Sequence, residues 1–340
     1  MLMVIIGAGA SYDSSPDNPP SKGAVMVYRP PLADDLFQPG SSFGAARGQF
    51  PEFHDLIPEL LPRAGRSLEK SLQRLQDEAA SDPYRHQQLT AIRYYLQTAF
   101  RDLIGRWTQT TAGVTNYRAL FGQIRHHRRD SEPVCVVTFN YDTLLENALQ
   151  LHCGMEFNVL DDYVCGKEFQ LFKLHGSQNW GRYLEGPIPI EISQGNTDPW
   201  GRPHEIIKHA GKLSVSNIFA VDDSVAKTFV GPPLYPAIAI PVLNKNVFEC
   251  PPAHVQMLTD LIPRVSKILT IGWRASEQNF LYLLQRLPAV KIITVAGSVP
   301  EAEESLNKIR LLGMPVLDTE CFANFSDTIA ERRLDPLLST

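Results

Sequence analysis

Residues 2–11 read LMVIIGAGAS. Five apolar residues, Leu2 to Ile6, precede Gly7-Ala8-Gly9-Ala10-Ser11, and this order is typical of a buried strand that enters a tight glycine turn. In open α/β sheets such a turn opens the helix of the first βα unit. The segment therefore predicts the first strand and the first βα turn of an α/β fold.

Four further apolar runs end in polar or glycine-containing turns. They cover residues 134–139 before Asn140, 169–174 before His175, 267–271 before Gly272 and 291–296 before Gly297. In an open parallel sheet the carboxyl ends of the strands share one edge, and ligands bind along that edge. We therefore expect an α/β fold: a Rossmann-like parallel sheet with helices on both faces and five turns that converge on one site.

Two stretches interrupt this pattern. We expect the Rossmann-like core to comprise residues 1–52, 130–180 and 236–340. Residues 53–129 have helical periodicity and predict a helical insertion, with an apolar stripe typical of a core or a self-association face (Leu89, Ile92, Leu96, Ala99, Leu103 and Trp107). Residues 181–235 are rich in Pro, Gly and Asp, and they predict a small irregular or β-rich insertion.

Composition excludes several classes of protein. The 340 residues include 32 Lys and Arg against 37 Asp and Glu, a formal net charge of −5, which argues against nucleic-acid binding and against attachment to an anionic membrane. No stretch approaches the roughly 18 apolar residues of a membrane span. The five cysteines form no C-x-x-C pair, so we expect no disulfide framework, no bound metal and a cytoplasmic location.

Taken singly, each candidate residue has two interpretations. Gly7-Ala8-Gly9 either lets the backbone approach a phosphate or only packs a strand on a helix. Tyr12 stands where the dehydrogenase fingerprint has its third glycine, so a hydride-transferring enzyme is disfavoured. Asn140 either caps the next helix or turns its amide toward the strand ends. His175 is either a general base at the rim of the sheet or a structural histidine.

Three motifs occur in a fixed order at the predicted strand ends: Gly7-Ala8-Gly9-Ala10-Ser11, Thr138-Phe139-Asn140-Tyr141-Asp142, and Lys173-Leu174-His175-Gly176-Ser177 continuing to Asn179-Trp180. Together they resemble the sirtuin-like domain of NADases from bacterial anti-phage defence systems. The turn at Gly272, followed by Glu277, Asn279 and Phe280, and the strand before Gly297-Ser298 extend the resemblance to about half of the chain.

The resemblance implies that NAD⁺ is a substrate whose nicotinamide–ribose bond is cleaved by water, with no metal. It implies a catalytic pair in which Asn140 places the water and His175 accepts a proton. Asp142 would hold the carboxamide or the ribose. The other implied contacts are Gly7, Ala8, Gly9 and Ser11 at the pyrophosphate, and Gly272, Gly297 and Ser298 at the adenosine half.

The resemblance further implies an effector that depletes NAD⁺ after infection. Such an effector is expected to act as a homo-oligomer or with a separately encoded partner such as a ring-forming ATPase. The chain lacks the paired-cysteine zinc module of protein-deacylating sirtuins, which disfavours an acyl-lysine peptide substrate. Two alternatives stay open: a non-catalytic module that binds NAD⁺ or ADP-ribose and reports it through assembly, and an NAD⁺-dependent transferase or protein deacylase.

Overall fold

The computed structural model describes residues 1–23, 28–38, 43–61, 67–128, 132–193, 201–222, 232–242 and 247–339. Contacts within the chain divide it into two compact units. Unit 1 consists of Met1–Leu32, Ile104–Leu174 and Pro252–Thr340, and unit 2 consists of Ala33–Leu103 and His175–Pro251. Within the described residues, no helix combines the length and the apolar character that a membrane crossing requires.

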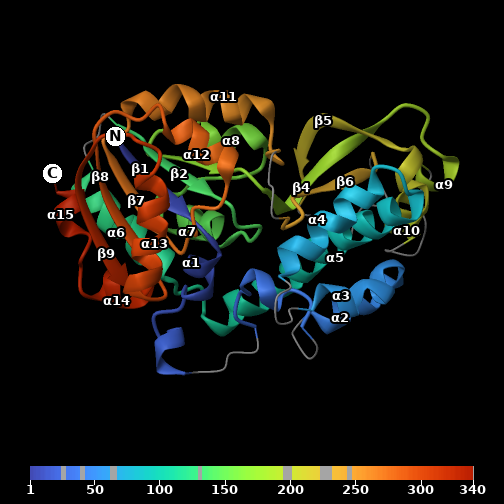
Figure 1. The fold of residues 1–340 in the computed structure, drawn as a ribbon, viewed down its shortest axis with the longest axis horizontal. Helices are drawn as coiled ribbons and strands as arrows, with labels where there is room; N and C mark the ends of the chain where they lie inside the picture. Colours follow the sequence, from blue (N-terminus) through green and yellow to red (C-terminus); the bar gives the residue numbers. More distant parts are fainter. Residues whose placement is uncertain are drawn as a thin grey trace. The chain divides into compact units, whose positions relative to one another are not determined.

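A six-stranded parallel sheet forms the centre of unit 1 (Figure 1). Its strand order is β3-β2-β1-β7-β8-β9, which confirms the predicted Rossmann-like fold. The strands are β1 (Leu2–Ile6), β2 (Val134–Thr138), β3 (Phe169–Lys173), β7 (Lys267–Ile271), β8 (Val290–Ala296) and β9 (Val316–Ala323).

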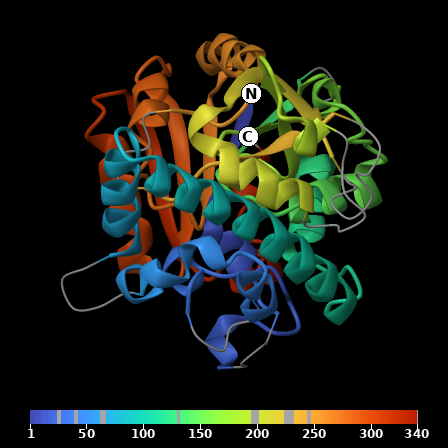
Figure 2. The same cartoon turned by 90° about the vertical axis from the view of Figure 1, so that its right-hand side faces the viewer.

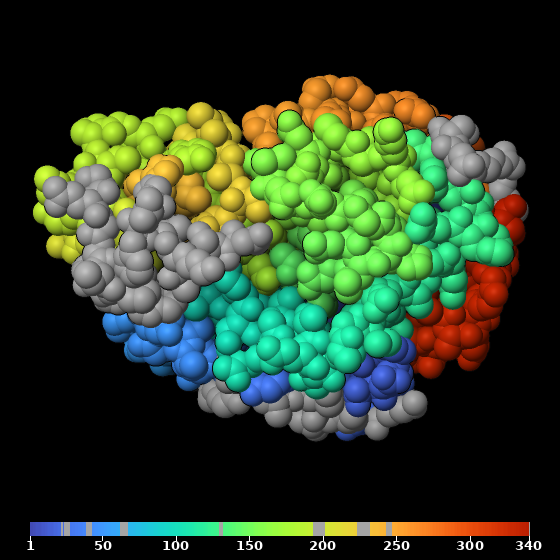
Figure 3. Space-filling model, turned by 180° about the vertical axis from the view of Figure 1, so that it is seen from behind, coloured from blue at the N-terminus to red at the C-terminus, as the bar shows by residue number. Residues whose placement is uncertain are grey.

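Helices cover both faces of this sheet. From β1 the chain winds outward in one direction to β3 and in the other direction from β7 to β9, so right-handed crossovers place the two sets of helices on opposite faces. Figure 1 shows α13 on the near face, and Figure 3 shows residues of α6, α7 and α8 covering the far face. The helices of unit 1 are α1 (Ala8–Tyr12), α6 (Asn116–His127), α7 (Leu144–Cys153), α8 (Leu160–Val164), α11 (Pro252–Leu261), α12 (Gln278–Leu284), α13 (Val299–Arg310), α14 (Phe325–Ala330) and α15 (Asp335–Leu338), with 3₁₀ turns at Pro20–Lys22 and Ile262–Arg264.

The central strands of the parallel sheet are the most apolar part of the molecule. β2 is buried along its whole length, and Met3 to Ile6 of β1 are 0% exposed. β1 pairs with β2 from Met3 opposite Cys135 to Ile6 opposite Thr138. Because both faces are covered by helices, such strands are continuous apolar runs without alternation. This is why the five strands with apolar sequences are predictable from sequence.

Unit 2 combines helices with a three-stranded antiparallel sheet of order β5-β4-β6. The strands are β4 (Gly176–Glu185), β5 (Ser214–Val221) and β6 (Leu234–Ile238). Its longest helix is α5 (Pro83–Thr110), which crosses the front of Figure 2 and whose residues from Ile104 onward belong to unit 1. The other helices are α2 (Gly44–Gly48), α3 (Ile57–Leu60), α4 (Leu68–Ala79), α9 (Ile190–Ser193) and α10 (Gly201–His209), with 3₁₀ turns at Ala33–Asp35, Pro51–Leu56 and Ala210–Lys212.

Side chains of α5 bind the small sheet directly. Tyr94 Oη donates to the carbonyl of Leu234 at 3.0 Å, and Gln97 Nε2 donates to the carbonyl of Trp180 at 3.0 Å. The apolar stripe predicted on this helix is buried from Leu89 to Trp107. The stripe is therefore part of the protein core, and it does not offer the self-association face that the sequence left open.

The boundaries of the two units differ from the predicted core and insertions. Residues 33–52 were expected in the core and belong to unit 2, whereas residues 104–128 were expected in the helical insertion and belong to unit 1. The reason is that α6 packs on α7 and on α14 beside the parallel sheet. The segment 236–251 also belongs to unit 2, because β6 pairs antiparallel with β4. Of the 181–235 insertion, residues 194–200 and 223–231 lie outside the described residues.

Candidate active site at the carboxyl edge of the parallel sheet

Hydrogen bonds join each strand end of the parallel sheet to its neighbour. One residue beyond each strand, backbone N–H groups continue the ladder with N···O distances of 2.8 to 3.2 Å (Leu174 to Thr138, Phe139 to Ile6, Gly7 to Ile271, Gly272 to Val295 and Asn324 to Ala296). These bonds fix the start of the segments that follow β3, β2, β1, β7 and β9 along one edge of the sheet. The loops after β1 and β7 flank the point where the strand order reverses, which is where dinucleotides bind in this fold.

The loops after β1 and β7 approach so closely that only glycine fits. A Cβ atom on Gly7 would lie 2.7 Å from the Cα atom of Trp273, and one on Gly9 would lie 2.9 Å from the Cα atom of Gly272. Gly272 has a φ of +61°, a conformation that glycine adopts without steric cost. The amide of Gly7 donates to the carbonyl of Ile271 at 2.9 Å, and that of Gly9 donates to the carbonyl of Gly272 at 3.1 Å.

These contacts correct the role predicted for the glycine turn. Gly7 and Gly9 were expected at the pyrophosphate of the substrate, and the structure shows that their N–H groups donate to the carbonyls of Ile271 and Gly272. The two glycines allow the close approach of the loops after β1 and β7, whereas the alternative left open by the sequence was the packing of a strand on a helix. Ala8, the first residue of α1, is the exposed residue of this turn.

Asn140 lies two residues beyond β2, and it is only 6% exposed. Its Nδ2 donates to the carbonyl of Gly7 at 3.0 Å and to Oγ of Ser11 at 2.9 Å. Because a carbonyl oxygen only accepts hydrogen bonds, the contact with Gly7 fixes which end of the amide is nitrogen. Both amide hydrogens are used, so Oδ1 is the atom that can accept a hydrogen bond from a ligand or water.

The hydroxyl of Ser11 is the centre of a buried network. It donates to Oδ2 of Asp142 at 2.7 Å, because a carboxylate only accepts, and it accepts from Asn140. The hydroxyl of Tyr117 lies 2.9 Å away and must therefore be the donor of that bond. A serine hydroxyl offers one donor and two acceptor positions, and all three are filled. Ser11 thus has no hydrogen left for the pyrophosphate contact predicted for it.

Asp142 anchors the segment that carries Asn140. Its Oδ1 accepts from the amide of Leu144, the first residue of α7, at 3.1 Å; the N-cap residue of this helix is Thr143, so Asn140 does not cap it. Burial raises the pKa of the Asp142 carboxyl, and the charge of Lys173 opposes that rise. The residue is 3% exposed, and both oxygens are engaged by the chain itself, whereas the prediction assigned them to the substrate.

Lys173 and Glu146 form a buried ion pair that contacts the segment carrying Asn140 and Asp142. Nζ of Lys173, the last residue of β3, donates to the carbonyl of Asp142 at 2.5 Å and to Oε1 of Glu146 at 2.7 Å. The side chain of Lys173 is 0% exposed and that of Glu146 is 6% exposed. Burial raises the pKa of Glu146, and Lys173 opposes that rise. A buried charge of this kind is tolerated only when it is paired and hydrogen-bonded.

The turn after β7 carries aromatic side chains. The indole ring of Trp273 stacks on Phe139 with ring centroids 5.7 Å apart, and its N–H group donates to Oε2 of Glu277 at 2.6 Å. Phe280 contacts both rings edge-on. The motif residues Glu277 and Phe280 therefore hold the tryptophan that follows Gly272, and this packing fixes the shape of the turn.

Gly297 and Ser298, predicted at the adenosine half, follow β8. Oγ of Ser298 accepts from the amide of Glu301 at 3.4 Å and caps α13. Gly297 is exposed. A Cβ atom on Gly297 would lie 2.9 Å from Oε2 of Glu301, so the acidic side chain leans over the glycine.

His175 begins the second segment of unit 2. It lies two residues beyond β3, as Asn140 lies two residues beyond β2, and it is 2% exposed. Its carbonyl accepts from the amide of Ala239 at 2.9 Å. Gly176 follows with a φ of +75°, so a left-handed glycine leads the chain from β3 into β4.

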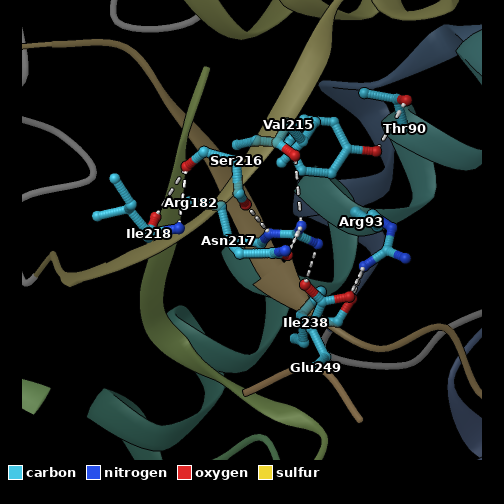
Figure 4. Close-up of polar contacts among 10 residues, drawn as sticks. Thr90, Arg93, Arg182, Val215, Ser216, Asn217, Ile218, Ile238 and Glu249 are labelled. Atoms are coloured by element: carbon cyan, nitrogen blue, oxygen red, sulfur yellow. Dashed lines mark hydrogen bonds and ion pairs between the residues drawn. The ribbon is translucent and has the colours of Figure 1, made fainter. Parts of the chain in front are cut away.

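Unit 2 has a polar cluster of its own (Figure 4). The carboxylate of Glu249 pairs with Nη1 of Arg182 at 2.9 Å and with Nη1 of Arg93 at 3.1 Å. Nε of Arg182 also donates to the carbonyl of Ser216 at 2.7 Å, and Arg93 donates to the carbonyl of Ile238. These contacts tie α5, β4, β5 and β6 together, and we interpret the cluster as structural.

Three members of the strand-end network were missed by sequence reasoning. Lys173 was quoted only as part of a motif, and neither Glu146 nor Tyr117 was singled out. One signal was present, because Glu146 lies in the first turn of the helix that follows Asp142. Tyr117 gave no signal, since its contact with Ser11 depends on how α6 packs.

Comparison with known proteins assigns the chain to no family. No protein-family model matches the chain, and no curated protein matches it significantly in sequence. Within the described residues, no group of three or more His, Cys, Asp or Glu side chains is arranged to hold a metal ion. The resemblance to sirtuin-like NADases stays a prediction from the three motifs.

Proposed function

We propose that the protein is an NAD⁺ glycohydrolase that converts NAD⁺ and water into nicotinamide, ADP-ribose and a proton. The observation that carries this proposal is the Asn140 amide, held by two hydrogen bonds at the carboxyl edge of a Rossmann-like sheet, beside the point where the strand order reverses. Dinucleotides bind at this point in such sheets. The order of the three strand-end motifs supports the same reaction class.

The reaction requires a positioned water. The C1′–N1 bond breaks with its electron pair going to the nicotinamide ring, which leaves as a neutral molecule, and the water oxygen bonds to C1′. In the proposal, Oδ1 of Asn140 accepts a hydrogen bond from that water, because Nδ2 is already used on Gly7 and Ser11. His175 takes the proton that the water loses.

The network behind Asn140 supports this role physically. A polar group contributes to catalysis when it is held in place before the reaction and does not reorganise during it. Asn140 is held through Ser11, and Ser11 is held in turn by Asp142 and Tyr117.

The cellular role follows the resemblance and belongs to the same proposal. An enzyme of this activity depletes NAD⁺ during phage infection, and its activity is controlled by self-assembly or by a separately encoded partner such as a ring-forming ATPase. We also propose a cytoplasmic location, where NAD⁺ is available.

The test is chromatographic detection of nicotinamide and ADP-ribose after incubation of the purified protein with NAD⁺, alone and after co-expression with its genomic neighbours. We expect equal amounts of both products from the parent, and loss of both in Asn140→Ala and His175→Ala. His126→Ala is the matched control, because this exposed histidine at the end of α6 lies outside the network. Circular dichroism verifies that each variant is folded.

Three other outcomes would each point elsewhere. NAD⁺ binding without any product contradicts hydrolysis and supports the sensor alternative. Product that appears only when an acylated peptide is added supports the deacylase alternative. Undiminished release by Asn140→Ala contradicts the proposed role of this residue while leaving the reaction in place.

A further inference from the structure

Lys173 is the most unusual buried residue of unit 1. It ends β3 opposite Thr138 of β2, and its side chain is 0% exposed. Lysine is almost never fully buried unless it is paired, because removing an ammonium group from water is expensive. An apolar side chain of similar volume would fill the same space without that cost, so packing alone does not call for a charged group here.

The ammonium group of Lys173 holds the segment that carries Asn140. It donates to the backbone carbonyl of Asp142 at 2.5 Å, while Oε1 of Glu146 accepts its second hydrogen bond at 2.7 Å. The carboxylate of Asp142 accepts a 2.7 Å hydrogen bond from the hydroxyl of Ser11. The same hydroxyl accepts a 2.9 Å hydrogen bond from the amide of Asn140. The buried pair is thus linked to the amide through the backbone and side chain of Asp142 and the hydroxyl of Ser11.

We propose that Lys173 and Glu146 form a buried positioning pair that fixes the orientation of the Asn140 amide. The inference rests on the function proposed above, because it assigns a purpose to the pair within that site. Neither residue touches the substrate. Their effect is exerted through the carbonyl of Asp142 and the hydroxyl of Ser11.

The charged and titratable groups around the pair are all part of this arrangement. Asp142 precedes α7 and Glu146 lies on its first turn, Tyr163 of α8 has its hydroxyl 3.5 Å from Oε1 of Glu146, and Tyr117 of α6 faces Ser11. Oε2 of Glu146 is buried without a hydrogen-bond partner among the described residues. The only cation in this group is Lys173, so its loss leaves two buried carboxylates without compensation.

The test separates positioning from stability by comparing a single with a double variant. Lys173→Met breaks the pair and is expected to lower the melting temperature. The double variant Glu146→Leu/Lys173→Met replaces both charges by apolar groups and is expected to regain a melting temperature near that of the parent. If the pair positions Asn140, the double variant still has at least a tenfold lower kcat for nicotinamide release, with KM changed by less than twofold.

A second readout does not depend on catalysis. With selective ¹⁵N-asparagine labelling, the side-chain amide signal of Asn140 is assigned by its disappearance in Asn140→Ala. We expect this signal to shift and its hydrogens to exchange with solvent faster in the double variant. If the parent releases no nicotinamide, the proposed function fails, and the NMR signal still decides whether the pair positions Asn140.

Two further variants keep the inference testable if the double variant does not fold. Glu146→Gln keeps the volume and an acceptor while removing the charge, and we expect at least a threefold lower kcat and a shifted Asn140 signal. Glu249→Gln in unit 2 is the matched control, because it also removes a carboxylate paired with cations but lies outside the network. A parent-like kcat and an unchanged Asn140 signal in a folded double variant or in Glu146→Gln would overturn the inference.

Discussion

The strand-end network of unit 1 and the Arg93–Glu249–Arg182 cluster of unit 2 use similar groups for different purposes. Each pairs a carboxylate with a long cation in a largely buried setting. In unit 2 the cations donate to strand carbonyls and to Oδ1 of Asn217 on β5, so the arginine contacts end on the small sheet. In unit 1 the contacts lead to the amide of Asn140 in a loop.

The difference lies in where each network ends. A cluster whose contacts end on residues of a sheet stabilises the fold. A network that ends on a side-chain amide, at the edge of the sheet where ligands bind, leaves an acceptor oxygen for another molecule. Buried charge alone therefore does not distinguish a functional site from a structural cluster. The distinction lies in whether the hydrogen bonds lead to a side chain at the ligand-binding edge of the sheet.

The largest expected effect concerns the loops that carry the network. Gly7→Ala places a Cβ atom 2.7 Å from the Cα atom of Trp273, and we expect it to lower the free energy of unfolding by about 3 kcal/mol or more. The matched control is Gly105→Ala on α5, where a Cβ atom meets nothing within 4 Å and helix propensity raises stability by roughly 0.5–1 kcal/mol. Guanidinium unfolding measures both, and equal effects of the two substitutions would contradict the close approach of the loops.

The second prediction concerns how the stability of unit 1 depends on pH. His254 on α11 of unit 1 is 2% exposed, and burial lowers its pKa from 6.5 to about 4. The unfolded chain therefore binds more protons between these values, and the free energy of unfolding falls by up to about 3 kcal/mol as pH drops from 6.5 to 4, with no contribution at higher pH.

The check compares the parent with His254→Leu between pH 7 and pH 4. The difference between the parent and the variant in the slope of the free energy of unfolding against pH gives the contribution of His254. Asp142 and Glu146 are present in both proteins, and their raised pKa values act with the opposite sign. Hydrogen exchange read separately over α11 and over β4 shows where protection is lost first, and we expect α11. Parallel slopes in the two proteins would show that His254 is not the source.

The third prediction compares two buried serines. Ser11→Ala removes one hydrogen bond from each of Asp142, Asn140 and Tyr117, and we expect a loss of roughly 2 kcal/mol in stability together with a strong loss of nicotinamide release. Ser216→Ala in unit 2 removes only a local turn bonded to Ile218, so we expect about 1 kcal/mol and unchanged release. Equal losses of activity per folded molecule would contradict the distinction.

The smallest expected effect belongs to the structural cluster itself. Glu249→Gln keeps an acceptor for one arginine, and both arginines are about one-fifth exposed, so water replaces part of the lost contact. We expect about 1 kcal/mol of lost stability and no change in nicotinamide release. A fall in release, measured on folded protein, would show that the unit 2 cluster takes part in function.

Much of the fold follows from the sequence, because buried parallel strands are unbroken apolar runs. All five strands expected to end at Gly7, Asn140, His175, Gly272 and Gly297 belong to the six-stranded sheet. The sixth strand, β9, was missed, because it lies at the edge of the sheet and the exposed residues Asp318 and Glu320 interrupt its apolar run. The unit boundaries were missed because α6 packs beside the parallel sheet, which periodicity does not reveal.

The candidate site was predictable in position and not in detail. Strand-end placement predicted that Asn140 lies at the carboxyl edge of the sheet, since position along a strand can be counted from sequence. The direction of each hydrogen bond was not predictable, so Ser11 was assigned to a phosphate although its proton goes to Asp142. The same holds for Lys173, whose partners are fixed by how α7 packs against β3.

The most direct test of the central claim is the rate of nicotinamide release from NAD⁺ by the parent and by Asn140→Asp at equal concentrations of folded protein. Asparagine and aspartate have nearly the same shape, but aspartate places an oxygen where Nδ2 now donates to the carbonyl of Gly7 at 3.0 Å. The account predicts steady release by the parent and a loss of at least a hundredfold in the variant. Equal rates in the two proteins, or no release by the parent under any condition in which NAD⁺ binds, would contradict it.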